Sequence, residues 1–215
     1  MKNHVVIVPA YNEKESIREL LEAVRHYDII CVVDGNDGTA AIAKEYGVVL
    51  TSKYKRGYGQ ALIDGLVHAF CAGYDTATVM DVGTCNPDFL YAYTKDADII
   101  VRSRYQFERG INSRFILSKL AALALSVATL SIVPDATTGY RTYNLQRIIP
   151  ILSQVQTNGH ATNMEILGLA LKNKLRVRYE SVPYTLDENT QLKAKDLWEA
   201  LRCIVRLIFT PRLST

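Results

Sequence analysis

Residues 4–13 read His-Val-Val-Ile-Val-Pro-Ala-Tyr-Asn-Glu, a short β-branched run that gives way to a polar loop. The residues that follow, 13–26, place apolar side chains at helical spacing along one face. A buried strand that leads through a polar loop into an amphipathic helix is the repeating unit of an α/β fold. This stretch therefore indicates the fold class by itself.

The same unit recurs through the first hundred residues. Continuous apolar runs predict strands at 28–33, 48–51, 76–80 and 98–101, and helical patterns occupy 39–46 and 58–72. Apolar strands separated by helices indicate a mostly parallel sheet that is covered on both faces. We expect one domain over residues 1–215, since no linker or repeat divides the chain.

Acidic and polar residues follow three of the predicted strands, at 9–13, 34–37 and 81–83. In open α/β sheets ligands bind at the carboxyl ends of the strands, so these residues predict a shared site at one edge. The alternative is that each Asp only caps the helix that follows it, since Asp and Asn are favoured there.

Composition indicates which binding partners and which cellular compartment to expect. The net charge of +3 is too small to indicate a nucleic-acid partner. Four widely spaced cysteines without a CxxC pair favour reduced thiols, as in a cytoplasmic protein. The N-terminus lacks the pattern of a signal peptide. The apolar stretch 115–133 is marginal for a membrane span, so we expect a buried or interfacial helix.

Eight segments in order resemble the family 2 inverting glycosyltransferases of the GT-A (Rossmann-like) fold, of the dolichol-phosphate mannose synthase type. They are 8–13, 32–39, 56–62, 79–81, 100–105, 135–141, 163–165 and 182–184, followed by Lys193. The resemblance implies a nucleotide-binding half at 1–105, an acceptor half at 106–190 and a C-terminal helix at 191–215. It also implies transfer of a sugar from GDP-mannose or a UDP-sugar to a polyprenyl- or dolichyl-phosphate-like acceptor in one inverting step.

For the donor, the resemblance carries over residue by residue. The positions implied to contact the nucleotide sugar are Pro9, Tyr11, Glu13, Asp34, Asp37, Gly59, Asp81, Val82 and Lys193. Asp81 stands at the first position of the DxD metal motif, whereas the later motif positions hold Gly83 and Cys85. One carboxylate makes a weak site, so we expect a divalent cation, Mg²⁺ or Mn²⁺, that the protein alone holds weakly.

For the acceptor, the resemblance implies that Arg104, Arg114 and Ser118 grip a phosphate, a ligand that suits the planar fork of Arg. Asp81, Arg104 and Arg141 are the implied catalytic set. A sugar or other hydroxyl acceptor would instead require a general base, for which Asp135 and Glu165 are the candidates. A third possibility is a weakly active nucleotide-sugar-binding protein, because the metal motif is incomplete.

Residues 193–212 have the pattern of a basic amphipathic helix, with basic side chains beside an apolar face. Such a helix is suited to an anionic membrane surface, which predicts a peripheral protein on the cytoplasmic membrane face. The alternative is a helix packed on the domain with its basic residues in solvent.

Overall fold

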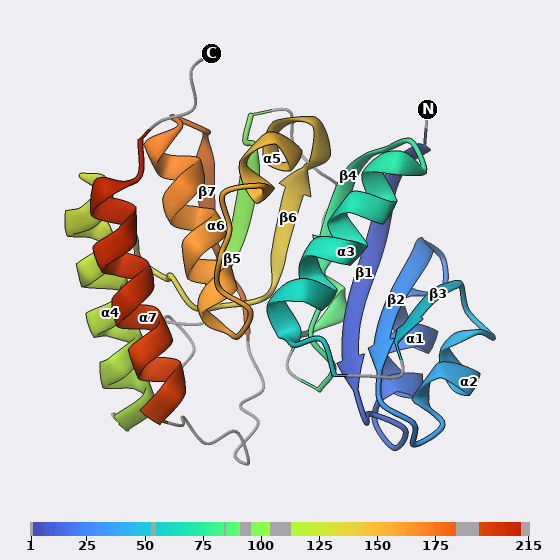
Figure 1. The fold of residues 1–215 in the computed structure, drawn as a ribbon. Helices are drawn as coiled ribbons and strands as arrows, with labels where there is room; N and C mark the ends of the chain where they lie inside the picture. The colour runs from blue at the N-terminus through green and yellow to red at the C-terminus, as the bar shows by residue number, and fades with distance from the viewer. Residues whose placement is uncertain are drawn as a thin grey trace.

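A central sheet organises the chain in the computed structural model, which describes residues 2–52, 55–83, 85–90, 96–103, 113–183 and 194–211. The described part of the sheet has seven strands in the order β3-β2-β1-β4-β6-β5-β7 (Figure 1). Their bounds are β1 Lys2–Tyr11, β2 Asp28–Asp34, β3 Val48–Ser52, β4 Tyr74–Val79, β5 Ile99–Ser103, β6 Arg141–Asn144 and β7 Val177–Ser181. Only β6, between β4 and β5, runs antiparallel to its neighbours among these strands.

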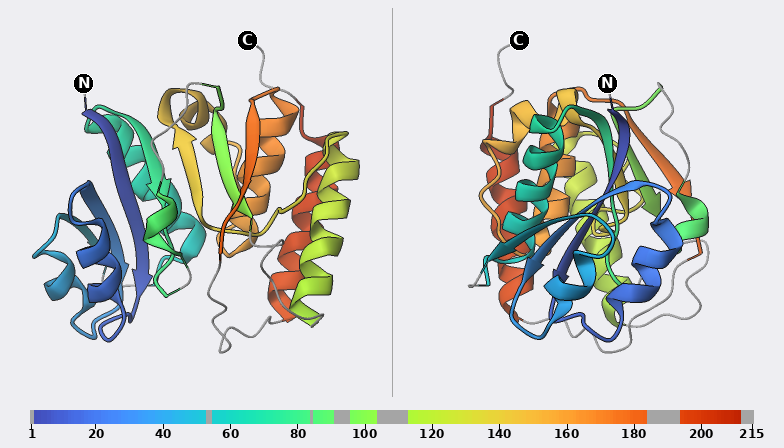
Figure 2. Two further views of the ribbon diagram at one scale, coloured as in Figure 1. Left: turned by 180° about the vertical axis from the view of Figure 1, so that it is seen from behind. Right: turned by 90° about the vertical axis from the view of Figure 1, so that its right-hand side faces the viewer.

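Helices cover both faces of the sheet (Figure 2). They are α1 Ile17–Val24, α2 Thr39–Ala43, α3 Tyr58–Cys71, the short 3₁₀ helix η1 Pro87–Phe89, α4 Ser113–Thr129, α5 Leu145–Leu152, α6 Ala161–Lys172 and α7 Ala194–Phe209. On one face α3 and α5 contact the strands, while α4 and α7 lie side by side and pack against α6 (Figure 1). On the other face lie α1 and α2.

The opening strand shows why this sequence builds a two-faced sheet. Val5, Val6, Ile7 and Val8 have no exposed surface. Because side chains alternate along a strand, Val5 and Ile7 belong to the core beneath α3, whereas Val6 and Val8 pack with α1. A continuous apolar run is therefore required here, and the prediction of a mostly parallel sheet is confirmed.

The second half differs from the sequence-based expectation. The short strand β6 was not predicted. Residues 182–184 resemble the family's final strand, but the last strand among the described residues, β7, covers Val177–Ser181. The apolar stretch 115–133 forms most of α4, which ends at Thr129. Across the part of the chain that the structure describes, no helix has the length and apolar character to cross a bilayer.

Candidate active site

The carboxyl ends of the central parallel strands meet at one edge of the sheet. Tyr11, at the end of β1, pairs in register with Asp34 at the end of β2. Beside them, Met80 follows β4 and donates its N–H to the carbonyl of Ile7. Because β6 is antiparallel, its first residue, Arg141, lies at the same edge, opposite Val79. The loops after β1, β2 and β4 and the segment before β6 therefore surround one site.

Asp37 joins the first two of these loops. Its Oδ1 accepts hydrogen bonds from the N–H and hydroxyl of Thr39, and its Oδ2 accepts one from the N–H of Lys14 at 3.1 Å. The bonds from Thr39 are the main cause that lowers the pKa of Asp37. The Thr39 hydroxyl also accepts the N–H of Glu13 at 2.9 Å. Asp37 thus fixes the shape of the loops after β1 and β2 through contacts within the protein.

Asp34 is almost fully buried and is held by Arg56. The Asp34 carboxylate accepts the backbone N–H of Arg56 at 2.8 Å and its Nε–H at 3.0 Å. The guanidinium also bonds Asp64 of α3 at 2.6 Å. Arg56 therefore sets the orientation of Asp34, the residue expected to contact the base or ribose. Arg56 lies in the resembling segment 56–62, but the sequence analysis did not assign it a contact with the donor.

Tyr11 lies at the mouth of this region. It is 45% exposed, and the Lys55 ammonium stands 3.8 Å from the centre of its ring. An exposed aromatic face beside a cation suits a base or a phosphate. Pro9 is buried within β1 and Val82 packs partly against the core near α1. Neither Pro9 nor Val82 has a polar side chain, so any polar contact of theirs with a donor would come from the backbone.

Asp81 is the acidic centre of the site. The Tyr58 hydroxyl donates to Asp81 Oδ1 at 3.1 Å, and the Asn163 side-chain amide donates to that hydroxyl at 3.0 Å. His160 stacks on the Tyr58 ring, with ring centres 5.0 Å apart. Burial, then the charge of Asp81, raises the pKa of Tyr58 well above its usual value, so the phenol remains a donor at neutral pH.

Burial is also the main cause that raises the pKa of the Asp81 carboxyl, while the Tyr58 hydrogen bond and the charges of His160 and Arg141 act in the opposite direction. A carboxylate in such a place is stabilised by an added cation. Gly139 faces its other oxygen, since a Cβ there would come within 2.1 Å of Asp81 Oδ2. Only glycine therefore allows the backbone of this segment to approach Asp81 so closely.

The structure describes only some of the residues that we expect to contact the acceptor. Arg104 and Lys193 lie outside the described residues, and so does the side chain of Arg114. Ser118 of α4 is buried, and its hydroxyl lies 2.6 Å from that of Thr137, in the segment before β6. The expected acceptor residue Ser118 is thus connected to the segment that also carries Gly139.

Asp135 begins that segment and is fully buried. Its Oδ1 accepts the N–H groups of Thr137 and Thr138 at 2.9 and 3.2 Å. Its Oδ2 has no hydrogen-bond partner within the described ranges. Asp135 therefore retains one carboxylate oxygen that could accept a proton.

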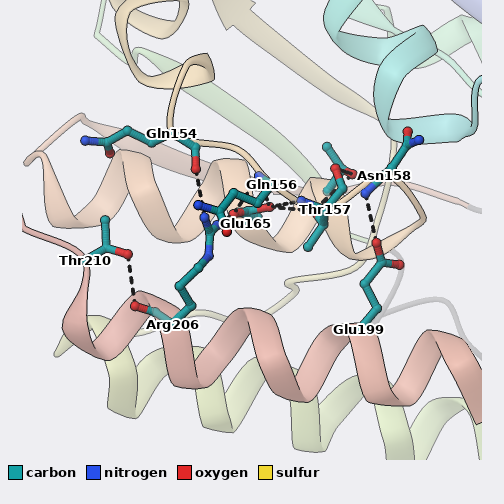
Figure 3. A network of polar contacts seen from close by, with 9 residues as sticks. Gln154, Gln156, Thr157, Asn158, Glu165, Glu199, Arg206 and Thr210 are labelled. Atoms are coloured by element: carbon teal, nitrogen blue, oxygen red, sulfur yellow. Dashed lines mark hydrogen bonds and ion pairs between the residues drawn. The ribbon is translucent and has the colours of Figure 1, made fainter.

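Glu165, the other candidate base, is placed differently. It is fully buried, accepts the N–H groups of Gln156 and Thr157, and forms an ion pair with Arg206 of α7 (Figure 3). Both carboxylate oxygens are engaged in these contacts. The geometry therefore favours a structural role for Glu165 over proton transfer.

Arg141 and Gly59 also act through the protein. Arg141 is fully buried and donates to the carbonyls of Thr138, Ala136 and Asn163. Its guanidinium holds the segment before β6 against α6, which makes it a positioning residue in this geometry. Gly59 donates its N–H to the Asn158 carbonyl at 3.1 Å, so its predicted effect on the donor is indirect.

Three residues near Asp81 were not assigned a role from the sequence. Tyr58 and Asn163 lie inside resembling segments, so their positions, although not their contacts, were available. His160 is a lone histidine in a loop, and no local pattern distinguishes it.

Cys85, which stands at a departure from the metal motif, accepts the Asp81 N–H at 3.2 Å through its sulfur and closes the turn after β4.

Comparison with known proteins gives concordant matches. The model of Glycosyl transferase family 2 matches residues 5–144. Polyprenol monophosphomannose synthase of Mycolicibacterium smegmatis is 30% identical over 206 residues, which cover 86% of this chain and 77% of that protein. UDP-N-acetylglucosamine–dolichyl-phosphate N-acetylglucosaminyltransferase of Methanococcus voltae is 23% identical over 235 residues, which cover 94% of each chain.

A solved structure supports the same fold. Glucosyl-3-phosphoglycerate synthase of Mycobacterium tuberculosis, in complex with Mn²⁺, uridine diphosphate and glucosyl-3-phosphoglycerate, superposes with a TM-score of 0.73. The superposition covers 99% of this chain and 82% of that one, at 14% sequence identity. At that identity the likeness concerns the arrangement of the strands and helices.

Proposed function

Because the chain belongs to glycosyltransferase family 2, we propose that this glycosyltransferase moves a sugar from a nucleotide diphosphate to a polyprenyl- or dolichyl-phosphate-like acceptor at a membrane surface. One observation carries the proposal. Asp81 follows β4, beside the loops after β1 and β2, and it lies against Gly139. Gly139 belongs to the segment 135–141, in which Thr137 contacts the expected acceptor residue Ser118. Donor and acceptor would therefore meet at Asp81.

The two relatives support the acceptor class. One is named for the synthesis of polyprenol monophosphomannose and the other for transfer to dolichyl phosphate, and both align over most of this chain. The proposed donor is GDP-mannose or a UDP-sugar, held by the loops that carry Tyr11, Glu13 and Asp34. Lys193 would add a positive charge near the diphosphate.

A divalent cation fits the residues at Asp81. Burial raises the pKa of the Asp81 carboxyl, and a hard oxygen ligand whose charge an added cation would stabilise suits Mg²⁺ or Mn²⁺. The described residues contain no group of three or more metal-ligating side chains of the His, Cys, Asp and Glu types. We therefore expect the donor phosphates to supply most of the other ligands, so that the protein alone binds the cation weakly. When bound, the cation would offset charge on the leaving diphosphate.

In the proposed reaction an oxygen of the acceptor phosphate attacks the anomeric carbon on the face opposite the diphosphate. The new C–O bond forms as the bond to the diphosphate breaks, and the nucleoside diphosphate leaves with the electron pair. The configuration at the anomeric carbon is inverted. A phosphate is already ionised at neutral pH, so the step needs no strong general base. Arg104, Arg114 and Ser118 would bind and orient that phosphate.

The outer pair of helices is suited to a lipid acceptor. Of the 16 large apolar side chains exposed among the described residues, most belong to α4, α7 or the turn after α4. We call these the apolar α4–α7 surface: Ile116, Leu120, Leu123, Val127, Leu130, Ile132, Leu197, Trp198, Leu201, Val205, Ile208 and Phe209. The sequence spacing of the members within each helix places them along one stripe. The two helices lie side by side (Figures 1 and 2).

The charge on the same helices favours a membrane as the contact. Lys119 of α4 and Arg202 of α7 are exposed next to the apolar stripes. Apolar side chains flanked by basic residues suit a bilayer that contains anionic lipid. We therefore propose peripheral binding at the cytoplasmic membrane face through this surface.

Asp135 supports a second candidate function. Its buried Oδ2 lacks a hydrogen-bond partner within the described ranges, and such an oxygen could take a proton from a hydroxyl nucleophile. In that case the acceptor would be a sugar or another alcohol rather than a phosphate.

A donor screen followed by an acceptor comparison tests the proposal. Thermal unfolding with a panel of nucleotide sugars and Mn²⁺ should identify the donor, because a ligand that binds only the folded state raises its stability. Transfer of that sugar to a short-chain polyprenyl phosphate and to the matching polyprenol is then measured. We expect transfer to the phosphate alone. Transfer to alcohols or sugars, lost in Asp135→Asn, would support the second candidate and contradict the first.

A further inference from the structure

The loop between α5 and α6, residues 153–160, is held by carboxylates from two helices. Glu165 of α6 accepts the N–H groups of Gln156 and Thr157. Glu199 of α7 accepts the next two, those of Asn158 at 2.8 Å and Gly159 at 3.0 Å. Figure 3 shows Glu199 extending from α7 to Asn158. Four consecutive N–H groups are therefore fixed by side chains on helices rather than by secondary structure of the loop.

On its other side, Asn158 caps the start of α3. Its carbonyl accepts the N–H of Gly59 at 3.1 Å, and its Oδ1 accepts the N–H of Gln60 at 2.8 Å. Its amide donates to the Arg56 carbonyl at 2.5 Å. The N-cap position of α3 is Gly57, which has no side chain to cap the helix. Helix N-termini require such acceptors, so α3 depends on a residue about one hundred positions later.

Glycine is needed where this loop approaches its neighbours. A Cβ on Gly159 would come within 2.3 Å of Glu199 Oε2, and one on Gly57 within 2.6 Å of the Asn158 carbonyl oxygen. Both approaches are closer than side chains allow. The loop is therefore fitted tightly between α7 and α3.

The start of α3 carries the residues that hold the two donor-site carboxylates. Arg56 orients Asp34, and Tyr58 donates to Asp81. Any shift of Asn158 would move the backbone of both residues, because Asn158 bonds the carbonyl of Arg56 and the N–H of Gly59. The contacts thus form a continuous path from α7 to the donor site.

We propose that Glu199 and Asn158 are positioning residues that set the affinity for the nucleotide diphosphate from outside its binding site. This inference rests on the proposed function, since it concerns the same donor site. Glu199 orders the loop, Asn158 caps α3, and the capped helix presents Arg56 and Tyr58 to Asp34 and Asp81.

Isothermal calorimetry with UDP and with GDP, each in the presence of Mn²⁺, provides the test. Glu199→Ala should weaken binding of the nucleotide that the wild type binds by about tenfold, the scale of losing one helix cap. Glu199→Gln should keep wild-type affinity, because its amide oxygen can accept the same two N–H groups. Asn158→Ala should weaken binding to a similar extent. The double variant should be no weaker than the more affected single variant, since both act on one path.

Glu19→Ala is the matched control, because it makes the same substitution at an exposed position on α1. Thermal unfolding of each apo variant separates positioning from stability. If Glu199→Ala lowers the unfolding temperature but leaves nucleotide affinity unchanged, the residue is merely structural and the inference is overturned. If the wild type binds neither nucleotide, the proposed function fails and this inference fails with it.

Discussion

Arg206 of α7 forms an ion pair with Glu165 of α6, whose carboxylate is fully buried (Figure 3). The same guanidinium donates to the Gln154 carbonyl at 3.0 Å. Arg206 therefore joins α7, α6 and the loop between α5 and α6 at one point. A buried carboxylate is costly to leave without its counter-charge, so this contact couples the docking of α7 to the stability of the core.

Arg206→Leu should consequently destabilise the protein strongly. It leaves the buried Glu165 charge unpaired, which typically costs about 3–5 kcal/mol. Adding Glu165→Gln should recover part of this loss, because an amide needs no counter-charge and can still accept from the loop. Urea unfolding followed by circular dichroism measures both variants. Equal stability of the Arg206→Leu variant and the wild type would contradict this interpretation.

His4 predicts how stability depends on pH. Burial, then the charge of Arg102, lowers the pKa of His4 to about 4, against an ordinary value of 6.5. The folded protein therefore holds the imidazole neutral, while the unfolded chain binds a proton below pH 6.5. The stability that results is fully present above pH 6.5 and is lost as pH falls toward 4. The loss at pH 4 is about 3 kcal/mol.

The comparison with His4→Gln isolates this effect. The difference in unfolding free energy between wild type and variant should shift by that amount between pH 7 and pH 4. Val67→Gln, an exposed substitution that involves no ionisable group, serves as the control and should show no such shift. A pH-independent difference for His4→Gln would rule out the buried neutral histidine.

The first half of the fold could be predicted because each of its strands is a continuous apolar run. Val5 to Val8 pack into cores on both faces of the sheet, which is the environment that a continuous apolar strand indicates. The strand β6 lacks that signature. It includes Arg141 and Thr142, both fully buried, and their polar groups are satisfied by partners such as Thr138 and Thr78, which lie elsewhere in the fold.

Part of the arrangement of the candidate residues could be predicted in the same way. The carboxylates at the ends of β1, β2 and β4 could be located because topology brings those ends together. The roles of Glu165 and Arg141 could not, since burial and partners depend on α6 and α7. The sequence pattern of Glu165, an acid near the start of a helix, is the same whether the acid faces a substrate or an arginine. The role of Asn158 could not be predicted from the sequence, because its partners, Glu199 and the start of α3, are distant along the chain.

Substitutions on the apolar α4–α7 surface test membrane contact more cleanly than removal of α7, which would expose the core around Cys203 and Leu207. Leu123→Gln with Leu201→Gln should reduce sedimentation with vesicles that contain anionic phospholipid. Each side chain withdrawn from an apolar environment costs about 1.5 kcal/mol or more. Raised salt should also weaken binding by screening Lys119 and Arg202.

Val67→Gln controls for the loss of apolar surface, because Val67 is exposed on α3 and lies outside the apolar α4–α7 surface. It should leave vesicle binding unchanged. A wild-type protein that ignores these vesicles at low salt would argue against the membrane contact and in favour of an acceptor in solution.

Asp81→Asn should abolish transfer while preserving the fold. The amide oxygen can still accept the Tyr58 hydroxyl, but the charge that would hold the cation is lost. We expect a rate at least about 100-fold lower, the scale of losing an electrostatic contact to a developing charge. Asp88→Asn, exposed in the same region, should retain full activity. Transfer within a few-fold of wild type in Asp81→Asn would refute the role of Asp81.

The incomplete metal motif gives the last prediction. If Asp81 is the sole protein carboxylate on the cation, metal and nucleotide should bind together. Calorimetry should then show little Mn²⁺ binding to the free protein and clear binding once a nucleoside diphosphate is present. Mn²⁺ should support transfer at least as well as Mg²⁺, because Mg²⁺ is stricter about octahedral geometry and releases water reluctantly.

Gly83→Asp should restore a second carboxylate at this site. Gly83 has a φ of +76°, and a Cβ there meets no atom within 4 Å, so the side chain has space but the backbone is strained. Asp tolerates this conformation better than most residues, at a cost of about 1 kcal/mol in the apo protein. The variant should bind Mn²⁺ more tightly without nucleotide, whereas Gly73→Asp, at a similar φ on the surface, should not. Full transfer in excess EDTA would overturn the cation site and leave Arg104 and Lys193 to neutralise the diphosphate.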